Sequence, residues 1–287
     1  MKDSALRQLA PAAVAASSFA CANVLSKVVF ADGGDVLTLL SIRSVVGLAF
    51  IAAWLWSGER PAPFSPRERW IALGLGLLFA VTVFGVLKAI DLMDVPTASL
   101  AYFVYPLLTG LVAALVGLER LGWRGAAAAA VAFLGLALMI GARPGEFALL
   151  GVLLAFVAAV TRAAMLLITR ALLTKSDPRL STWYSLLSST IVFVVISLAM
   201  RDWTPPHTIV GWVSLAGISA AMPIAILGIF VSTGRVGPFR TALVMNLEPL
   251  LGTLGSVIFL GDAFGPLQAL GGAIMLAALV AFQLRRD

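Results

Sequence analysis

The chain has 287 residues, of which 61% are hydrophobic and only 12% are charged, and its mean hydropathy is +1.02. An average soluble domain is about half apolar and a quarter charged, so this composition excludes an ordinary water-soluble protein and favours one embedded in a lipid bilayer. The net charge of +6 does not indicate nucleic-acid binding, because the basic residues lie in short loops between apolar runs.

Ten segments are long and apolar enough to cross a membrane, which takes about 20 residues at 1.5 Å each. They lie at roughly 9–30, 36–57, 69–90, 96–117, 122–141, 147–170, 180–200, 208–233, 238–260 and 264–284. The first follows basic residues, as in a signal peptide, but it continues to about Phe30, so we expect a retained helix. Short breaks with turn residues, such as Gly33-Gly34 and Asp177-Pro178, separate the segments.

The basic residues predict the orientation of these spans. If the N-terminus is cytoplasmic, 14 of the 20 lysine and arginine residues lie at inner ends, whereas only Arg143 and Arg201 lie at outer ends. All 7 tryptophans fall near predicted span ends, as in an interfacial belt. Both termini are therefore predicted to be cytoplasmic.

The second half of the chain repeats the first. The first copy contains Tyr105-Pro106-Leu107-Leu108 followed by Glu119, and the second contains Glu248-Pro249-Leu250-Leu251 followed by Asp262. Equivalent positions are separated by one constant offset (249 − 106 = 143). The match predicts two five-helix units, 1–143 and 144–287. Because five is odd, the second unit would be inverted in the membrane, which is the architecture of secondary transporters with a site between the halves. A duplication that now serves only packing is the alternative.

These features resemble the drug/metabolite transporter superfamily, in its EamA-type branch, over nearly the whole chain. The resemblance rests on ten spans in a 5+5 repeat, on Asn23 and Lys27 late in the first helix, and on the Pro-Leu-Leu stretches of the fourth and ninth helices. It implies a cavity lined by helices 1, 3, 4, 6, 8 and 9. The chain looks most like bacterial exporters of aromatic amino acids, which implies a location in the inner (plasma) membrane.

Five ionisable residues fall inside predicted spans, where a charge near the centre costs about 2.5–3.5 kcal/mol and marks a functional candidate. They are Lys27, Arg43, Lys88, Arg162 and Glu248. Glu248 is the deepest, and we consider three roles for it: a proton carrier, a counter-charge for an ammonium group, or a structural carboxyl beside Pro249.

Arg162 has two interpretations. It could pair with Glu248 or with the carboxylate of a substrate, or its side chain could snorkel towards the inner surface. Snorkelling is the favoured interpretation for Lys27 and Lys88, and a structural role for Arg43. Positions at which only one half is polar are the better site candidates. Such pairs are Glu248 with Tyr105, Arg162 with Phe19, Lys88 with Val231, and Asn246 with Phe103.

Pro106 and Pro249 lie in the middle of their spans and are expected to kink them and to act in gating. Tyr102 and Tyr105 lie three residues apart, on one helix face, where they could stack on an aromatic or cationic substrate or simply pack. The predicted substrate-binding or cavity residues are Asn23, Phe79, Lys88, Tyr102, Tyr105, Arg162, Asn246 and Glu248.

Enzyme signatures are missing from the sequence. It contains no phosphate-binding G-x-x-x-x-G-K-[ST] loop, no H-E-x-x-H and no G-x-S-x-G. With one cysteine, Cys21, and one histidine, His207, it offers no cysteine cluster and little for histidine-based metal chemistry. We therefore predict neither enzymatic activity nor a cofactor or metal.

The overall prediction is an all-α integral membrane protein of ten helices in two inverted repeats. It would export aromatic and other neutral amino acids, or similar amphipathic solutes, by alternating access. Two alternatives stay open: a multidrug or cationic-compound exporter on the same scaffold, and a membrane enzyme or lipid-handling protein. The expected partners are a small-molecule substrate and the lipid bilayer, and small residues in the fifth and tenth spans allow a homodimer contact.

Overall fold

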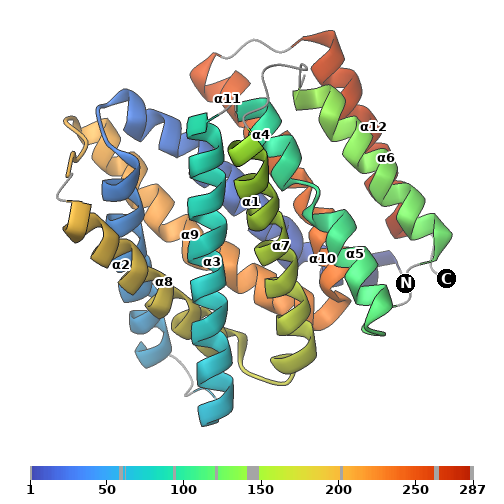
Figure 1. Ribbon diagram of the computed structural model, residues 1–287, viewed down its shortest axis with the longest axis horizontal. Helices are drawn as coiled ribbons and strands as arrows, with labels where there is room; N and C mark the ends of the chain where they lie inside the picture. Colours follow the sequence, from blue (N-terminus) through green and yellow to red (C-terminus); the bar gives the residue numbers. More distant parts are fainter. Residues whose placement is uncertain are drawn as a thin grey trace.

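The computed structural model describes residues 2–57, 61, 63–92, 95–119, 122–140, 149–200, 203–261 and 265–284. Within them the chain forms twelve α-helices and no strand (Figure 1). In chain order they are α1 (Lys2–Ala31), α2 (Val36–Ser57), α3 (Pro66–Leu92), α4 (Val95–Tyr102), α5 (Tyr105–Leu115), α6 (Trp123–Ile140), α7 (Leu149–Leu172), α8 (Pro178–Met200), α9 (Ile209–Val236), α10 (Pro238–Met245), α11 (Leu247–Leu260) and α12 (Pro266–Leu284).

The helices are long and apolar enough to span a bilayer in eight places, two of which are the pairs α4–α5 and α10–α11. The helices α6 and α12 add two shorter apolar stretches, Trp123–Met139 and Pro266–Ala281. The predicted class, a helical membrane protein, is confirmed. Eight of the ten predicted spans meet the length requirement among the described residues, and the helices extend several residues beyond some predicted bounds.

Two of the predicted spans are each divided into two helices. Proline lacks the N–H that would bond the carbonyl four residues earlier, and its ring clashes with that carbonyl. Counting back four residues from Pro106 reaches Tyr102, where α4 ends, and from Pro249 it reaches Met245, where α10 ends. The two breaks therefore lie at equivalent places in the two halves.

Helix contacts also repeat with the same spacing. A Cβ atom on Gly85 of α3 would lie 2.8 Å from the Leu154 carbonyl oxygen of α7, and one on Gly228 of α9 would lie 2.6 Å from that of Pro11 on α1. Both the glycines and their partners are related by the offset of the repeat (228 − 85 = 154 − 11). Each half thus places a glycine where a helix of the other half approaches closely.

The helices α6 and α12 lie side by side at one edge of the molecule (Figure 1). A Cβ atom on Gly135 would lie 2.7 Å from the Met275 nitrogen and 2.8 Å from the Gly271 carbonyl oxygen. Gly135 and Gly271, small residues of the fifth and tenth predicted spans, thus make a contact inside the chain.

At the end of the molecule away from the chain termini, Asp35 ties the start of α2 to the loop before α9. One of its carboxylate oxygens accepts bonds from Leu37 N (2.7 Å) and Thr38 N (2.9 Å), and the other accepts from Thr204 N (2.9 Å). Burial opposes the charged form, but the hydrogen bonds of Thr38 and Thr204 outweigh it and lower the pKa of Asp35 to about 2.

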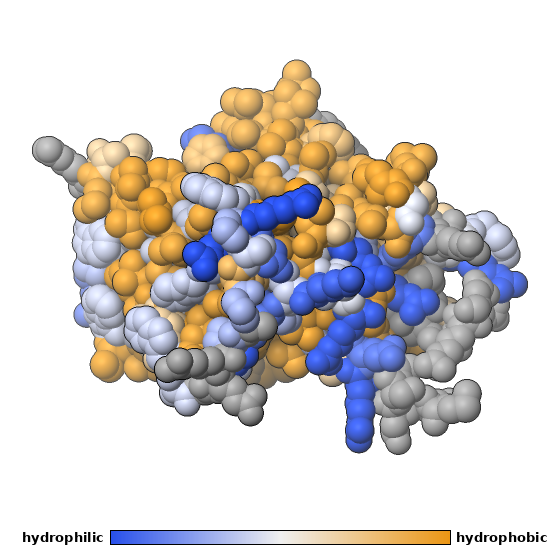
Figure 2. All heavy atoms as spheres, turned by 90° about the horizontal axis from the view of Figure 1, so that it is seen from below, coloured by the Kyte–Doolittle hydropathy of each residue, from blue (hydrophilic) through white to orange (hydrophobic). Residues whose placement is uncertain are grey.

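The other end, where α1 begins and α12 finishes, is called here the termini end. Seen from this side, hydrophilic side chains gather over an otherwise apolar surface (Figure 2). Exposed basic residues in the loops and helix ends that meet here are Arg7, Arg67, Arg69, Arg124, Lys175, Arg235 and Arg240. The two ends of the molecule thus differ in charge.

Candidate functional site

Three aromatic rings gather at the break between α4 and α5. The Tyr102 ring lies 5.1 Å from that of Phe103 and 5.4 Å from that of Tyr105, and Phe103 and Tyr105 are 5.9 Å apart. Rings at such separations attract each other in tilted and edge-on arrangements. Tyr105 is buried, whereas Tyr102 is only partly buried. The interruption of the helix therefore places a compact aromatic wall near the middle of the molecule.

Arg162 of α7 packs against this wall. Its guanidinium lies 5.8 Å from the centre of the Tyr105 ring and 5.3 Å from that of Phe19 on α1, so one cation faces two aromatic rings. The side chain is only 3% exposed, which rules out snorkelling to the surface. Within the described part of the chain, no carboxylate lies within ion-pair distance of Arg162, although Glu248 is close enough to influence it electrostatically.

Glu248 lies in the first turn of α11, beyond the second helix break. Its carboxylate accepts a hydrogen bond of 3.1 Å from the Asn23 amide nitrogen of α1. Glu248 is partly buried and Asn23 is exposed, so this pair borders open space, whereas Arg162 is enclosed. The two opposite charges are thus close without being paired directly.

Several buried polar atoms near this centre lack a hydrogen-bond partner among the described residues. They are the Tyr105 hydroxyl, Arg162 Nε and Asn246 Oδ1. Asn246 forms the second helix break, between α10 and α11, and is 3% exposed. A buried polar atom without a partner costs about 1–3 kcal/mol. A bound ligand could satisfy such atoms, which lie at the two helix breaks and on the helix beside them.

The repeat explains where this site lies. Arg162 and Phe19 are equivalent positions (162 − 19 = 143), and they contact each other. A residue that touches its own counterpart lies on the axis relating the two halves. Tyr105 and Glu248 are also equivalent, as are Phe103 and Asn246, so the aromatic wall of one half corresponds to the polar groups of the other.

Two further predicted cavity residues, Phe79 and Lys88, are not among the residues joined by the contacts described above. Phe79 of α3 is buried in the main apolar core, and its ring is not part of the aromatic contacts that join Tyr102, Phe103 and Tyr105. Lys88 lies nine residues further along α3, about 13 Å at 1.5 Å per residue, and it is exposed. The contacts described above thus join Tyr102, Tyr105 and Arg162 in one group and Asn23 and Glu248 in another.

Sequence reasoning did not select two aromatic residues of the cluster. Phe19 and Phe103 appeared only as the counterparts of polar positions, yet both lie in the aromatic contacts around Tyr105 and Arg162. The signal that indicated them was the repeat itself. Among the described residues, no group of three His, Cys, Asp or Glu side chains is arranged to hold a metal ion.

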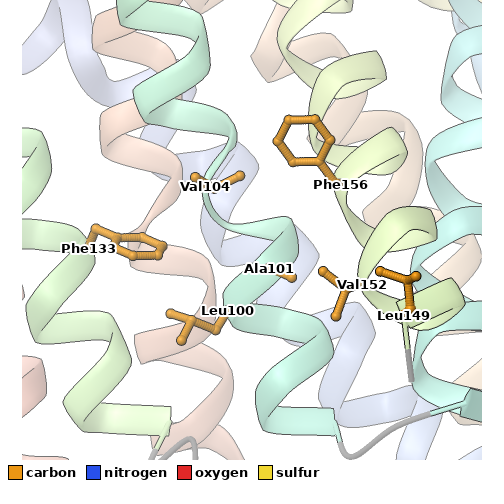
Figure 3. Close-up of a pocket in the computed structure, with 7 residues that line it drawn as sticks. All are labelled: Leu100, Ala101, Val104, Phe133, Leu149, Val152 and Phe156. Atoms are coloured by element: carbon orange, nitrogen blue, oxygen red, sulfur yellow. The ribbon is translucent and has the colours of Figure 1, made fainter. Parts of the chain in front are cut away.

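A separate cavity of about 580 Å³ opens between α4, α6 and α7. Figure 3 shows Leu100, Val104 and Phe133 facing Val152 and Phe156 across it. All of its lining side chains are hydrocarbon, so it can accommodate an apolar group but offers nothing to recognise a charge. Its lining includes neither Arg162 nor Glu248.

Comparison with known proteins agrees with this architecture. One solved structure, titled only "Crystal structure of protein", superposes with a TM-score of 0.82 at 19% sequence identity, covering 96% of this chain and 99% of the other. No curated protein matches the sequence. The profile of the EamA-like transporter family matches twice, over residues 9–141 and 149–282. The chain therefore belongs to the EamA-like transporter family.

Proposed function

We propose that this chain exports aromatic and other neutral amino acids across a bacterial inner membrane. In this proposal it has ten spans in two inverted units, 1–143 and 144–287, and it works by alternating access. The observation that carries the proposal is the buried Arg162, with its unpaired Nε, beside an aromatic wall and close to Glu248.

The three chemical parts of an amino acid each have a counterpart in this cluster. Arg162 suits the carboxylate, because a guanidinium offers several N–H donors in a planar fork. Glu248, which borders open space, suits the ammonium group, with Asn23 holding its carboxylate in place. The rings of Tyr102, Phe103 and Tyr105 suit an aromatic or bulky apolar side chain.

Other solute classes fit this arrangement less well. A lipophilic cation would find Glu248 and the aromatic rings, but it would be repelled by the buried charge of Arg162. A phosphorylated or nucleotide sugar needs several convergent cations, and the cluster supplies only Arg162. The multidrug exporter therefore remains a second candidate, which Arg162 argues against.

The orientation in the membrane follows from the charge on the two ends. The exposed arginines and lysine of the termini end (Figure 2) support a cytoplasmic location for that end and for both termini. The breaks at Phe103–Val104 and Asn246 offer places where one part of each divided span can tilt on the other. Alternating exposure of the cluster to the two sides would follow from such tilting. Export rather than uptake rests on the resemblance to bacterial exporters.

The direct test is flux in liposomes that contain the purified protein. We expect selective flux of labelled phenylalanine, tyrosine or leucine, and no flux of a lipophilic cation. Tyr102→Ala should weaken flux of aromatic substrates more than that of aliphatic ones, because its ring would stack only on the former. Flux of the cation without any amino acid would favour the drug exporter, and equal losses for all amino acids in Tyr102→Ala would contradict stacking.

A further inference from the structure

Glu119 lies just beyond α5, at the termini end, and contacts the turn between α9 and α10. Its carboxylate accepts a hydrogen bond from the backbone N–H of Phe239, in the first turn of α10. Gly237 in this turn has φ +93°, and a Cβ atom there would overlap the Glu119 carboxylate. The glycine thus allows the carboxylate to reach the N-terminus of α10, which favours negative charge.

An apolar contact between α5 and α10 accompanies the polar one. A Cβ atom on Gly110 of α5 would lie 2.6 Å from the Phe239 ring, so the two helices approach without an intervening side chain. Phe239 is 4% exposed. The middle of α5 and the start of α10 are therefore in close contact.

The surrounding turn is held firmly by polar contacts. The Ser232 and Thr241 hydroxyls lie 2.8 Å apart, and Thr241 also bonds the Gly237 carbonyl at 2.7 Å. Arg170 of α7 donates to the Gly234 carbonyl at 2.7 Å. The start of α10 is therefore a fixed surface, and Glu119 is the ionisable group that fastens α5 to it.

We propose that Glu119 is a proton-binding residue that closes the termini end of the transport path. When it is protonated, its neutral carboxyl group can stay buried between α5 and the N-terminus of α10, which keeps the path shut. When it is deprotonated, its charge is more stable in water than in this buried position, so the end of α5 moves away from α10 and the path opens on that side. The inference rests on the proposed transport function, but Glu119 takes no part in the substrate cluster.

The electrostatics of Glu119 support this role. Burial raises the pKa of Glu119 to about 7, although the Phe239 N–H, Arg170 and Arg240 act in the opposite direction. Both protonation states are therefore populated near neutral pH. The charged groups that face it are Arg170 from α7 and Arg240 from α10, and both favour the deprotonated form.

A cysteine placed between the gate and the substrate cluster reports on opening. Thr109 lies on α5, one turn from Tyr105 towards Glu119, and it is fully buried. Thr109→Cys in a Cys21→Ala background would be treated with a membrane-impermeant thiol reagent in inside-out and right-side-out vesicles. Because a thiol reacts faster at high pH, each rate is divided by the rate in the same protein with Glu119→Gln at the same pH.

The expected ratio rises with the deprotonated fraction of a group with a pKa near 7. It should be close to 1 at pH 6, where Glu119→Gln matches the protonated carboxyl group, and rise several-fold by pH 8, only when the reagent reaches the termini end. Arg240→Gln should move the midpoint to higher pH, because Arg240 lowers the pKa of Glu119. Glu68→Gln, which removes another carboxylate at this end, serves as the matched control and should leave the profile unchanged.

A ratio that does not change with pH, or a midpoint unaffected by Arg240→Gln, would overturn the gate. The assay needs no substrate, so it separates this proposal from the transport proposal. Labelling that depends on pH together with the absence of amino acid flux would support the gate and reject the substrate assignment. Amino acid flux together with labelling that does not change with pH would support the transport proposal and reject the gate.

Discussion

The two halves of the chain share their scaffold and differ in their chemistry. Gly85 and Gly228 make equivalent contacts, and both divided spans break at the same position. At the axis between the halves, however, Phe19 of the first half faces Arg162 of the second, and Tyr105 corresponds to Glu248. Positions that the repeat preserves thus build the framework, and positions at which it diverges carry the charge and the aromatic surface.

The halves also differ in how tightly they are closed. The apolar cavity beside Leu100 and Ala101 in the first half has buried residues at the equivalent positions of the second, since Leu243 is 0% and Val244 is 6% exposed. A transporter built from inverted repeats exposes one side at a time when its halves adopt different conformations. The proposed gate at Glu119 would depend on this difference in packing between the two halves.

The largest effect on transport should come from Arg162, which lies on the axis between the halves and differs from its counterpart Phe19. Arg162→Met removes the buried cation and should reduce amino acid flux on the order of 100-fold, because loss of one member of a buried charge interaction costs about 2–5 kcal/mol. Phe19→Leu, at the equivalent position, removes only a ring facing the cation and should cost less than about tenfold. Equal losses in the two variants, measured in liposomes, would contradict the asymmetric site.

The shared glycines should behave alike. Gly85→Ala and Gly228→Ala each force a methyl group against a carbonyl oxygen of a neighbouring helix and should each lower the free energy of unfolding by about 2 kcal/mol. Gly74→Ala is the matched control, because a Cβ atom there meets nothing within 4 Å. Denaturant titration in detergent measures all three variants. A large loss at one shared glycine only would break the equivalence of the halves.

A single carboxylate, that of Asp35, should contribute more to stability at the end away from the termini than the Ser176–Glu68 bond contributes at the termini end. Asp35→Asn should cost about 2 kcal/mol at pH 7, because the folded-state pKa of about 2 lies below the ordinary value of 3.8. This contribution is complete above pH 4 and is lost as the pH falls from 4 to 2.

Ser176 makes the corresponding link at the termini end, where its hydroxyl bonds Glu68. Ser176→Ala should cost only about 1 kcal/mol. Thermal unfolding of both variants at pH 7 and pH 3 measures the difference. An Asp35→Asn protein as stable as the parent at pH 7 would show that the charge is not needed.

The smallest effect concerns the turn before α10. Ser232 and Thr241 bond each other, whereas the equivalent positions of the first half are Ala89 and Ala98. Ser232→Ala alone should cost about 1 kcal/mol, because it leaves the buried Thr241 hydroxyl without this partner. Replacing both residues by alanine should be nearly neutral, as the first half implies. A double variant much less stable than the single one would contradict this account.

The sequence was sufficient to predict the helical membrane class, the family and the position of the breaks. Hydropathy and length decide the class, and proline chemistry decides where a long span is interrupted. The single constant offset between the halves identified Arg162 and Glu248 as departures from symmetry. These properties depend on local composition and on counting along the chain, so they can be deduced before any helix is packed.

Contacts between helices were beyond such reasoning. A span that is apolar on all sides gives no signal for which face turns inward, so which of its residues meet at the centre of the molecule could not be deduced. Whether Arg162 snorkels or stacks depends on Phe19, its counterpart in the other half, and the Asn23–Glu248 bond joins helices far apart in sequence. The closed turn at Glu119 likewise requires two elements from different halves.

The most direct test of the central claim is binding of phenylalanine, its amide and its N-acetyl derivative to the parent protein, Arg162→Met and Glu248→Gln, measured by calorimetry. The account predicts that the parent prefers phenylalanine over both derivatives. Arg162→Met should lose only the preference over the amide, and Glu248→Gln only the preference over the N-acetyl compound. Unchanged preferences in both variants would contradict the assignment of these residues to the carboxylate and the ammonium group.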